Sequence, residues 1–394
     1  MRVTSETGTA TLAQVVHVLE QMYDPAWARD WDAVGLVCGD PSAPVRRVLL
    51  AVDPVEVVVD EAVAWHADLL LTHHPLLLRG VHGVAATTFK GRVIHRLIRS
   101  GCGLYTAHTN ADVAAPGVSD ALARVLGLTD LEPLAADAAD PVDKLVTFVP
   151  EGDVDKVVDA LTAAGAGDIG EYARCAFTSA GTGTFTPGSG ARPTVGEIGR
   201  RNDVPEQRVE MVLPRARRAA VVAALRQAHP YEEPAFDLYE LASWSGPRGI
   251  GRVGRLANPT TLREFAMLVA EALPGSAQGV RVAGDPMGEV SRVAVCGGAG
   301  DGLLDAVRAS GADVFVTADL RHHVASEARE AAGENGPYLV DVAHWTSEWP
   351  WLAGVANRLE GALEAAGTPV EVHVSVKCTD PWTFRVPSPG GVVR

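Results

Sequence analysis

The chain has 394 residues, of which 47% are hydrophobic and 21% charged, a composition that excludes a disordered protein and suits two or three domains. Its formal net charge of -15 disfavours nucleic-acid binding, because nucleic-acid binders gather Lys and Arg on one face. The five cysteines form no C-x-x-C pair and no apolar run of about 18 residues occurs, so we expect a cytoplasmic protein without a membrane span.

The first part of the chain predicts alternating strands and helices. Its β-branched and apolar runs are short, and the segments between them place apolar residues at helical spacing. This order is typical of a parallel sheet that crossover helices cover on both faces. The predicted elements are helices at 11–22, 54–65, 91–100 and 119–126 and strands at 45–52, 67–72 and 103–107.

The order of elements changes near Pro141. A strand, a helix, a polar Gly/Thr/Pro/Ser tract at 178–193, a strand and a helix follow, which indicates a compact α+β module. Alternating strands and helices then return. We therefore predict an α/β fold whose core is discontinuous, with halves at 1–140 and 244–394, and an α+β domain inserted at 141–243. The predicted elements of the second half are a helix at 261–273, helices that follow Gly302, Arg321 and Thr346, and strands at 290–296, 313–317 and 338–341.

Two adjacent histidines, His73 and His74, follow the apolar strand predicted at 67–72. Ligands of open α/β sheets collect beyond the carboxyl ends of the strands. Neutral imidazole is the commonest nitrogen ligand of metals, and neighbouring histidines can diverge toward two ions. An isolated His-His pair is more often a hydrogen-bonded loop feature, so this pair needs support from other segments.

Two further predicted strands end in residues of the same kind. One is followed by His108 and Asp112, and the other by His344 and Glu348, whose spacing of four residues brings both side chains to one side of a helical turn. Asp supplies a hard oxygen ligand and Glu can bridge two cations, although Asp112 alone is more often a helix cap or turn residue. Independent core histidines would not be expected at three strand ends, so the joint pattern predicts a metal site.

A fourth strand end, after 313–317, carries Asp319, His322 and His323. These could be further ligands, side chains that orient the ligands, or a pair for proton transfer. We favour the last two roles, because five or six ligands already fill two open sites. A capped helix with exposed histidines explains His322 equally well, and Asp319 and His323 are the candidate catalytic residues.

The glycine-rich segment CGGAGDG, Cys296 to Gly302, follows a predicted strand and precedes a predicted helix. Its backbone amides could hold an anion at the start of that helix, and a tight turn explains the glycines about as well. It lacks the Lys and Ser/Thr of a phosphate-binding loop. The segment GIGRVG that begins at Gly249 is a weaker candidate, because a strand is predicted to run through it.

Taken in chain order, several motifs resemble those of the GTP cyclohydrolase I type 2 family, also called the Nif-three-like dinuclear-metal proteins. The resemblance covers nearly the whole chain. It implies that the insert has a PII-like, ferredoxin-like fold and that the protein forms a toroidal homohexamer whose metal sites face an internal cavity. The motifs are WDAVGL, LLLTHHP, AHTNADVA with GVSDALA, HPYEEPAFD, GIGRVG, GGAGDG, TADLRHH and DVAHWTSE.

The resemblance also implies two divalent metal ions per subunit, with Glu348 bridging them and His108 as a further candidate ligand. The ions would be Zn, Fe, Mn or Co, because the donors are nitrogen and carboxylate oxygen without thiolate. Ala318, His322 and Ala343 depart from the family pattern and leave the substrate pocket undecided. The implied ligands are His73, His74, Asp112, His344 and Glu348.

These features predict a metal-dependent hydrolase acting on a nucleotide or a related small phosphorylated molecule, because paired metals polarise a substrate and lower the pKa of a bridging water. The family name suggests ring opening of GTP, but the sequence identifies no base-specific pocket. The alternative is a non-catalytic metal-binding regulatory or adaptor protein, whose PII-like insert senses a ligand or binds a protein partner. A role in metal storage or delivery would also fit two well-liganded sites.

Overall fold

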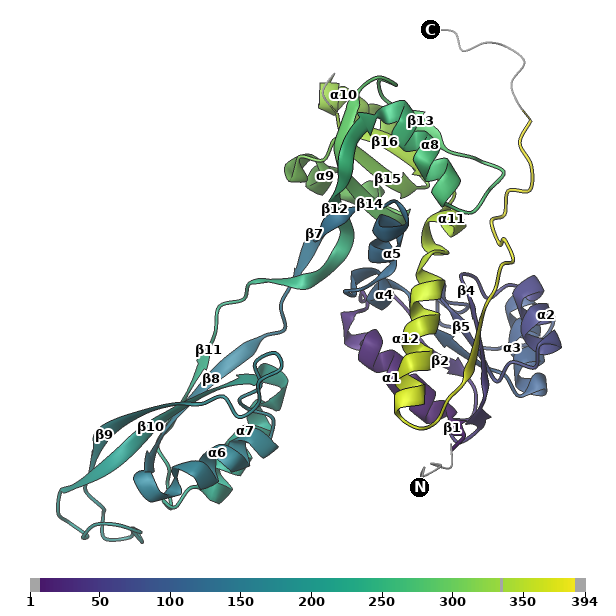
Figure 1. The fold of residues 1–394 in the computed structure, drawn as a ribbon. Helices are drawn as coiled ribbons and strands as arrows, with labels where there is room; N and C mark the ends of the chain where they lie inside the picture. The colour runs from purple at the N-terminus through teal and green to yellow at the C-terminus, as the bar shows by residue number, and fades with distance from the viewer. Residues whose placement is uncertain (1–7, 334–335, 387–394) are drawn as a thin grey trace, which may run out of the picture. The chain divides into compact units, whose positions relative to one another are not determined.

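The computed structural model describes residues 8–333 and 336–386 and has a mixed α/β fold with several sheets (Figure 1). The chain divides into two compact units. Unit 1 comprises the described residues up to Asp137 and those from Pro247 onward, and unit 2 is Ala138–Gly246. The insert predicted at 141–243 lies within unit 2. In the part of the chain that the structure describes, no helix is long and apolar enough to cross a membrane.

One sheet of unit 1 has five strands, and helices cover both of its faces. Leu49 and Leu70 point to the face covered by α2 (Glu56–Ala64) and α3 (Phe89–Ser100). Their neighbours in sequence point to the other face, which α1 (Leu12–Met22) and α12 (Trp351–Ala365) cover. Burial on both faces explains the continuous apolar runs of these strands. The strand order is β17 (Glu371–Val374), β4 (Arg47–Ala51), β5 (Leu69–Thr72), β6 (Gly103–Thr106) and β2 (Gly35–Cys38), all parallel except β2.

The second sheet of unit 1 has six strands. α5 (Val118–Val125) and α8 (Leu262–Ala272) pack on one face, and α9 (Leu304–Ser310) and α10 (His322–Ala332) pack on the other. The three central strands β14, β15 and β16 are parallel. The strand order is β13 (Arg281–Ala283), β16 (Tyr338–Val342), β15 (Val314–Ala318), β14 (Glu289–Ala299), β12 (Ser245–Thr261) and β7 (Thr129–Ala138).

Local sequence signals account for several element ends. Capping boxes begin α1 and α8, where Thr11 and Thr261 accept hydrogen bonds from the backbone N–H groups of Gln14 and Glu264. β12 runs through the GIGRVG segment, as expected. The shorter elements of unit 1 are β1 (Ala10–Thr11), β3 (Pro44–Val45), α4 (Thr109–Val113), α11 (His344–Glu348) and the 3-10 helices η1 (Pro25–Trp27) and η4 (Asp301–Leu303).

Unit 2 has the order β-α-β-β-α-β of a ferredoxin-like split βαβ unit. Its antiparallel sheet has the order β11-β8-β10-β9, and α6 and α7 pack on one face through a shared apolar core. The polar tract at 178–193, for which no strand was predicted, supplies most of β9, because hydrogen bonds to β10 hold this weak strand former at the sheet edge. The elements are β8 (Val142–Pro150), η2 (Glu151–Asp153), α6 (Val154–Ala163), β9 (Phe177–Phe185), β10 (Asn202–Pro214), η3 (Arg215–Arg217), α7 (Arg218–Ala228) and β11 (Phe236–Glu240).

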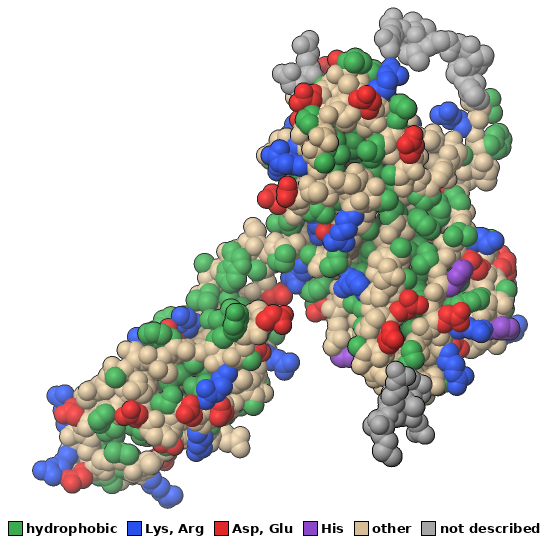
Figure 2. Space-filling model, in the orientation of Figure 1, with side chains coloured by type: hydrophobic (Ala, Val, Ile, Leu, Met, Phe, Trp, Pro, Cys, Tyr) green, Lys and Arg blue, Asp and Glu red, His purple; other side chains and the backbone are tan. Residues whose placement is uncertain are grey.

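Charged side chains of both signs are interspersed on the face of the molecule drawn in Figure 2. Lys and Arg side chains lie among Asp and Glu side chains there, and the described residues on this face form no continuous basic surface. Attraction of a polyanion would need such a surface.

Candidate metal centre

Six of the predicted site residues meet at the strand ends of unit 1. Two come from the segment after β5, two from the start and body of α4, and two from the ends of α11, which follows β16. The five-stranded and six-stranded sheets therefore both contribute, as the strand-end pattern predicts. The residues brought together are His73, His74, His108, Asp112, His344 and Glu348.

Each of the four histidines uses its Nδ1 atom for a hydrogen bond to an oxygen. Carbonyl and carboxylate oxygens accept, so each Nδ1 carries a proton and Nε2 is left as the ring atom that can bind a metal. Partners of this kind fix the orientation of metal-binding histidines. The pairs are His73 with Ala107 O at 2.9 Å, His74 with Asp53 Oδ1 at 2.7 Å, His108 with Asp32 Oδ1 at 2.8 Å and His344 with Asp319 Oδ2 at 2.7 Å.

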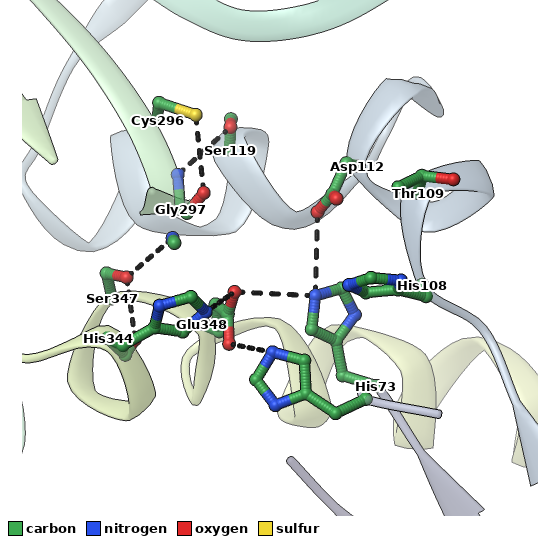
Figure 3. A network of polar contacts seen from close by, with 12 residues as sticks. His73, His108, Thr109, Asp112, Ser119, Cys296, Gly297, His344, Ser347 and Glu348 are labelled. Carbon is green, nitrogen blue, oxygen red and sulfur yellow. Dashed lines mark hydrogen bonds and ion pairs between the residues drawn. The ribbon is translucent and has the colours of Figure 1, made fainter. Parts of the chain in front are cut away.

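The Nε2 atoms of three histidines surround the carboxylate of Glu348 (Figure 3). Glu348 Oε1 lies 3.0 Å from His344 Nε2 and 3.5 Å from His73 Nε2, and Oε2 lies 3.2 Å from His74 Nε2. Asp112 Oδ1 lies 3.6 Å from His73 Nε2. Donor atoms around one four-coordinate ion with bonds of about 2.0–2.1 Å are roughly 3.3 Å apart, so these separations suit ligands that share a cation.

Two buried atoms of the cluster, His73 Nε2 and Glu348 Oε2, have no hydrogen-bond partner. A buried polar atom without a partner destabilises the fold, and a bound cation would remove that cost. Burial alone would raise the pKa of Glu348, but the neighbouring histidines hold it well below its ordinary value, which keeps the ligand anionic. The donor set therefore fits a divalent cation.

The possible ligands form two overlapping groups. Within each group, one ligand atom per residue lies within 4.8 Å of the others. The first group is His73, His74 and His108, and the second is His74, His344 and Glu348.

The two candidate catalytic residues differ in position. Asp319 accepts a hydrogen bond from His344 Nδ1, so it lies beside the cluster and orients the ring of His344. The ring of His323 instead faces that of His322, with centroids 5.2 Å apart, and neither belongs to the ligand groups found among the described residues. The structure thus brings Asp319 to the cluster and leaves His323 outside it.

The glycine-rich segment contributes to the site in a way that its sequence does not reveal. β14 continues through this segment to Ala299 instead of ending before it. Gly298 has φ +68°, and a Cβ atom there would lie 2.5 Å from Glu348 Oε1. Its N–H donates to Ser347 Oγ at 2.8 Å. The glycine therefore lets the backbone approach the cluster, and no anion site is needed to explain it.

Sequence reasoning missed two carboxylates, Asp32 and Asp53, that hold His108 and His74. Asp53 follows the end of β4, so the strand-end argument that selected the histidines could have found it. Thr379, near the far end of the chain, donates a hydrogen bond to Asp53 Oδ2. Nothing in the local sequence around Thr379 indicates that contact.

Comparison with known proteins gives consistent matches across nearly the whole chain. The family model for Duf34/NIF3 (NGG1p interacting factor 3) matches residues 10–381. A GTP cyclohydrolase 1 type 2 homolog of Mycobacterium tuberculosis is 52% identical over 378 residues, 95% of this chain and 97% of the relative. Its counterpart in Bacillus subtilis is 39% identical over 371 residues, 94% and 98% of the two chains. The crystal structure of a Bacillus cereus protein related to NIF3 superposes with a TM-score of 0.81 at 37% identity and covers 96% of this chain and 100% of that one.

Proposed function

Because the chain belongs to the Duf34/NIF3 (NGG1p interacting factor 3) family, we propose that it is a metal-dependent hydrolase with two divalent ions per subunit. Its substrate is a nucleotide or a related small phosphorylated molecule. The observation that carries this proposal is the pair of ligand groups, which overlap at His74, with Glu348 in contact with both His73 and His74.

In this proposal the carboxylate of Glu348 is shared between the two ions. Its two oxygens face different histidines, and Oε2 has no hydrogen-bond partner. A bridging carboxylate accounts for both facts. His73, His108, Asp112 and Glu348 would hold one ion, and His344, Glu348 and His74, the residue that both ligand groups contain, would hold the other. The ions are Zn, Fe, Mn or Co, the metals that suit nitrogen and carboxylate donors.

The ions would supply Lewis-acid polarisation of the substrate and an activated water. The chain supplies the orientation of the ligands, because Asp32, Asp53 and Asp319 each hold an imidazole through Nδ1. Asp319 has a half-exposed side chain, so it is also placed to exchange a proton with solvent. His323 remains a second candidate for proton transfer. The name of the relatives, GTP cyclohydrolase 1 type 2 homolog, supports a nucleotide substrate.

We extend the proposal to assembly and location. A toroidal homohexamer would enclose the metal centres, and a PII-like role for the insert is supported by the βαββαβ order of unit 2. The five cysteines are free, which suits the reducing cytoplasm. Sedimentation analysis tests the hexamer, and a mass of one or two chains would contradict it.

Metal content and turnover test the central proposal. Elemental analysis of protein prepared without chelator is expected to give two ions per chain, and Glu348→Ala and His74→Ala are expected to lose them. His322→Ala is the matched control, because His322 lies outside the ligand groups. Less than one ion per wild-type chain would refute the metal site.

For turnover, the metal-loaded protein is incubated with a panel of nucleotides and small phosphate esters. Products should form with the wild type and His322→Ala and be absent with Glu348→Ala. If the loaded wild type forms no metal-dependent product, the hydrolase proposal fails. The non-catalytic regulatory alternative would then be favoured, since it needs the ions but no reaction.

A further inference from the structure

A pocket of about 600 Å³ lies within unit 2. Its walls come from β8, β9, β10, the segment that follows β9 and the segment that follows α7, and every lining residue belongs to this unit. The volume falls within the range of small-molecule sites, about 300–1,000 Å³. The metal centre of unit 1 does not contribute to it.

The pocket contains a buried carboxylate, Glu206 of β10, whose exposed fraction is only 8%. Glu206 Oε1 accepts a hydrogen bond from the hydroxyl of Tyr231 at 2.8 Å. Among the described residues, no Lys, Arg or His forms an ion pair with Glu206, and its Oε2 accepts no hydrogen bond. Burying a carboxylate without a cation destabilises the fold, so a positively charged ligand beside Glu206 would be stabilised here.

The neighbouring strand leaves space for this carboxylate. Gly183 of β9 has no side chain, and a Cβ atom there would lie 2.1 Å from Glu206 Oε2. Any other residue at this position would push the carboxylate away. The glycine therefore gives the carboxylate the space to lie in the wall of the pocket.

The remaining walls are mainly apolar and aromatic. Phe148, Phe185 and Tyr231 line the pocket, and the rings of Phe185 and Tyr231 lie 6.1 Å apart between centroids. Tyr231 is anchored, because its N–H donates to His229 Nδ1 at 3.1 Å while His229 Nε2 donates to Phe148 O at 2.9 Å. Aromatic walls held in this way suit a flat apolar body.

The charge of the lining is acidic. Glu232 and Glu233 join Glu206, and the one basic lining residue, Arg208, already pairs with Glu210 at 2.9 Å. Burial, and then the hydrogen bond to Glu206, raise the pKa of Tyr231, so its hydroxyl stays protonated and continues to donate. An anionic ligand would be repelled here, and a neutral one would leave the carboxylate unpaired.

We propose that this pocket binds a small organic cation, whose protonated amine or amidine pairs with Glu206 and whose flat apolar body packs against the rings of Phe185 and Tyr231. The site is separate from the metal centre and does not depend on its activity. It assigns the inserted unit a ligand-binding role with a defined chemical class.

Calorimetric titration of the full chain tests the proposal with three cations, tryptamine, phenethylamine and benzamidine, and with indole-3-propionate as an anion of matched shape. At least one cation should bind saturably, and the anion should not. Glu206→Gln, which keeps the shape and removes the charge, should weaken cation binding at least tenfold, in line with a charge-assisted pair. Glu197→Gln, an exposed carboxylate outside the pocket, should bind as the wild type does.

A second measurement separates ligand binding from a structural role. Because Glu206→Gln removes a buried charge without a cationic partner, its unfolding temperature should equal or exceed that of the wild type. Phe185→Ala should weaken cation binding at least tenfold through lost contact with the ligand body. Equal affinity for tryptamine and indole-3-propionate, no saturable binding of any of the cations, or a change of oligomeric state in Glu206→Gln would each overturn the proposal.

Discussion

Replacing Gly298 by alanine should disable the metal centre without unfolding the protein. Alanine at φ +68° costs about 1–2 kcal/mol in backbone strain. Its Cβ atom would lie 2.5 Å from Glu348 Oε1, where ordinary contact begins near 3.4 Å, so the oxygen must retreat by about 0.9 Å. Metal sites tolerate deviations of only about 0.2 Å, so a displacement of this size should weaken binding by roughly 10- to 100-fold.

The assay is the dissociation constant of each ion, measured by competition with a chromogenic chelator, together with thermal unfolding of the same preparations. Gly302→Ala is the matched control, because Gly302 lies in the same glycine-rich segment and a Cβ atom there meets nothing within 4 Å. Since Glu348 faces both ligand groups, both ions should be lost together in Gly298→Ala. If Gly298→Ala holds both ions with the affinity of Gly302→Ala, the close approach of this strand to Glu348 has no role in metal binding.

Three further predictions concern orientation, pH and metal removal. Asp53→Asn should weaken metal retention about tenfold, because Asp53 holds His74 through Nδ1, and metal content after dialysis measures this. Asp143→Asn should lower the free energy of unfolding by about 1 kcal/mol at pH 7, because Asp143 accepts hydrogen bonds from Arg218 and Arg215. The hydrogen bond from Arg218 is the largest of the interactions that hold the pKa of Asp143 below its unfolded value of about 3.9. The stability difference between wild type and Asp143→Asn should therefore persist above pH 4 and vanish as pH falls through the folded pKa. Denaturant titration at several pH values measures it. A chelator should lower the unfolding temperature of the wild type, since ions at a hundredfold excess over Kd stabilise the folded state by about 2.7 kcal/mol, and an unchanged calorimetric transition would contradict metal binding.

Sequence reasoning reached the cluster because its residues follow a rule of chain order. His73 and His74 end an apolar strand of one sheet, His344 and Glu348 follow a strand of the other sheet, and ligands collect beyond the carboxyl ends of such strands. The same rule could not distinguish Asp319 from His323. Asp319 accepts a hydrogen bond from His344 Nδ1, whereas His323 lies outside the ligand groups. Both follow the same strand, and only the backbone path after β15 separates them.

Other features depend on contacts between distant parts of the chain. The polar tract of unit 2 has little strand propensity of its own, and hydrogen bonds to β10 make it β9. The sequence around Gly183 does not indicate a role for it, because the carboxylate that occupies the space beside this glycine belongs to Glu206 of β10. Thr379 reaches Asp53 across more than three hundred residues of sequence.

The residue types and their order along the chain determined the α/β class, the inserted α+β module and which residues were candidate ligands, because hydrophobic periodicity and strand-end position are local properties. Only the tertiary structure decided which nitrogen of each histidine bonds to a carbonyl or aspartate oxygen, which aspartates hold the rings, and that Gly298 and Gly183 each make room for a carboxylate. Those facts depend on distances between segments far apart in sequence, and such distances are set by packing rather than by any local pattern.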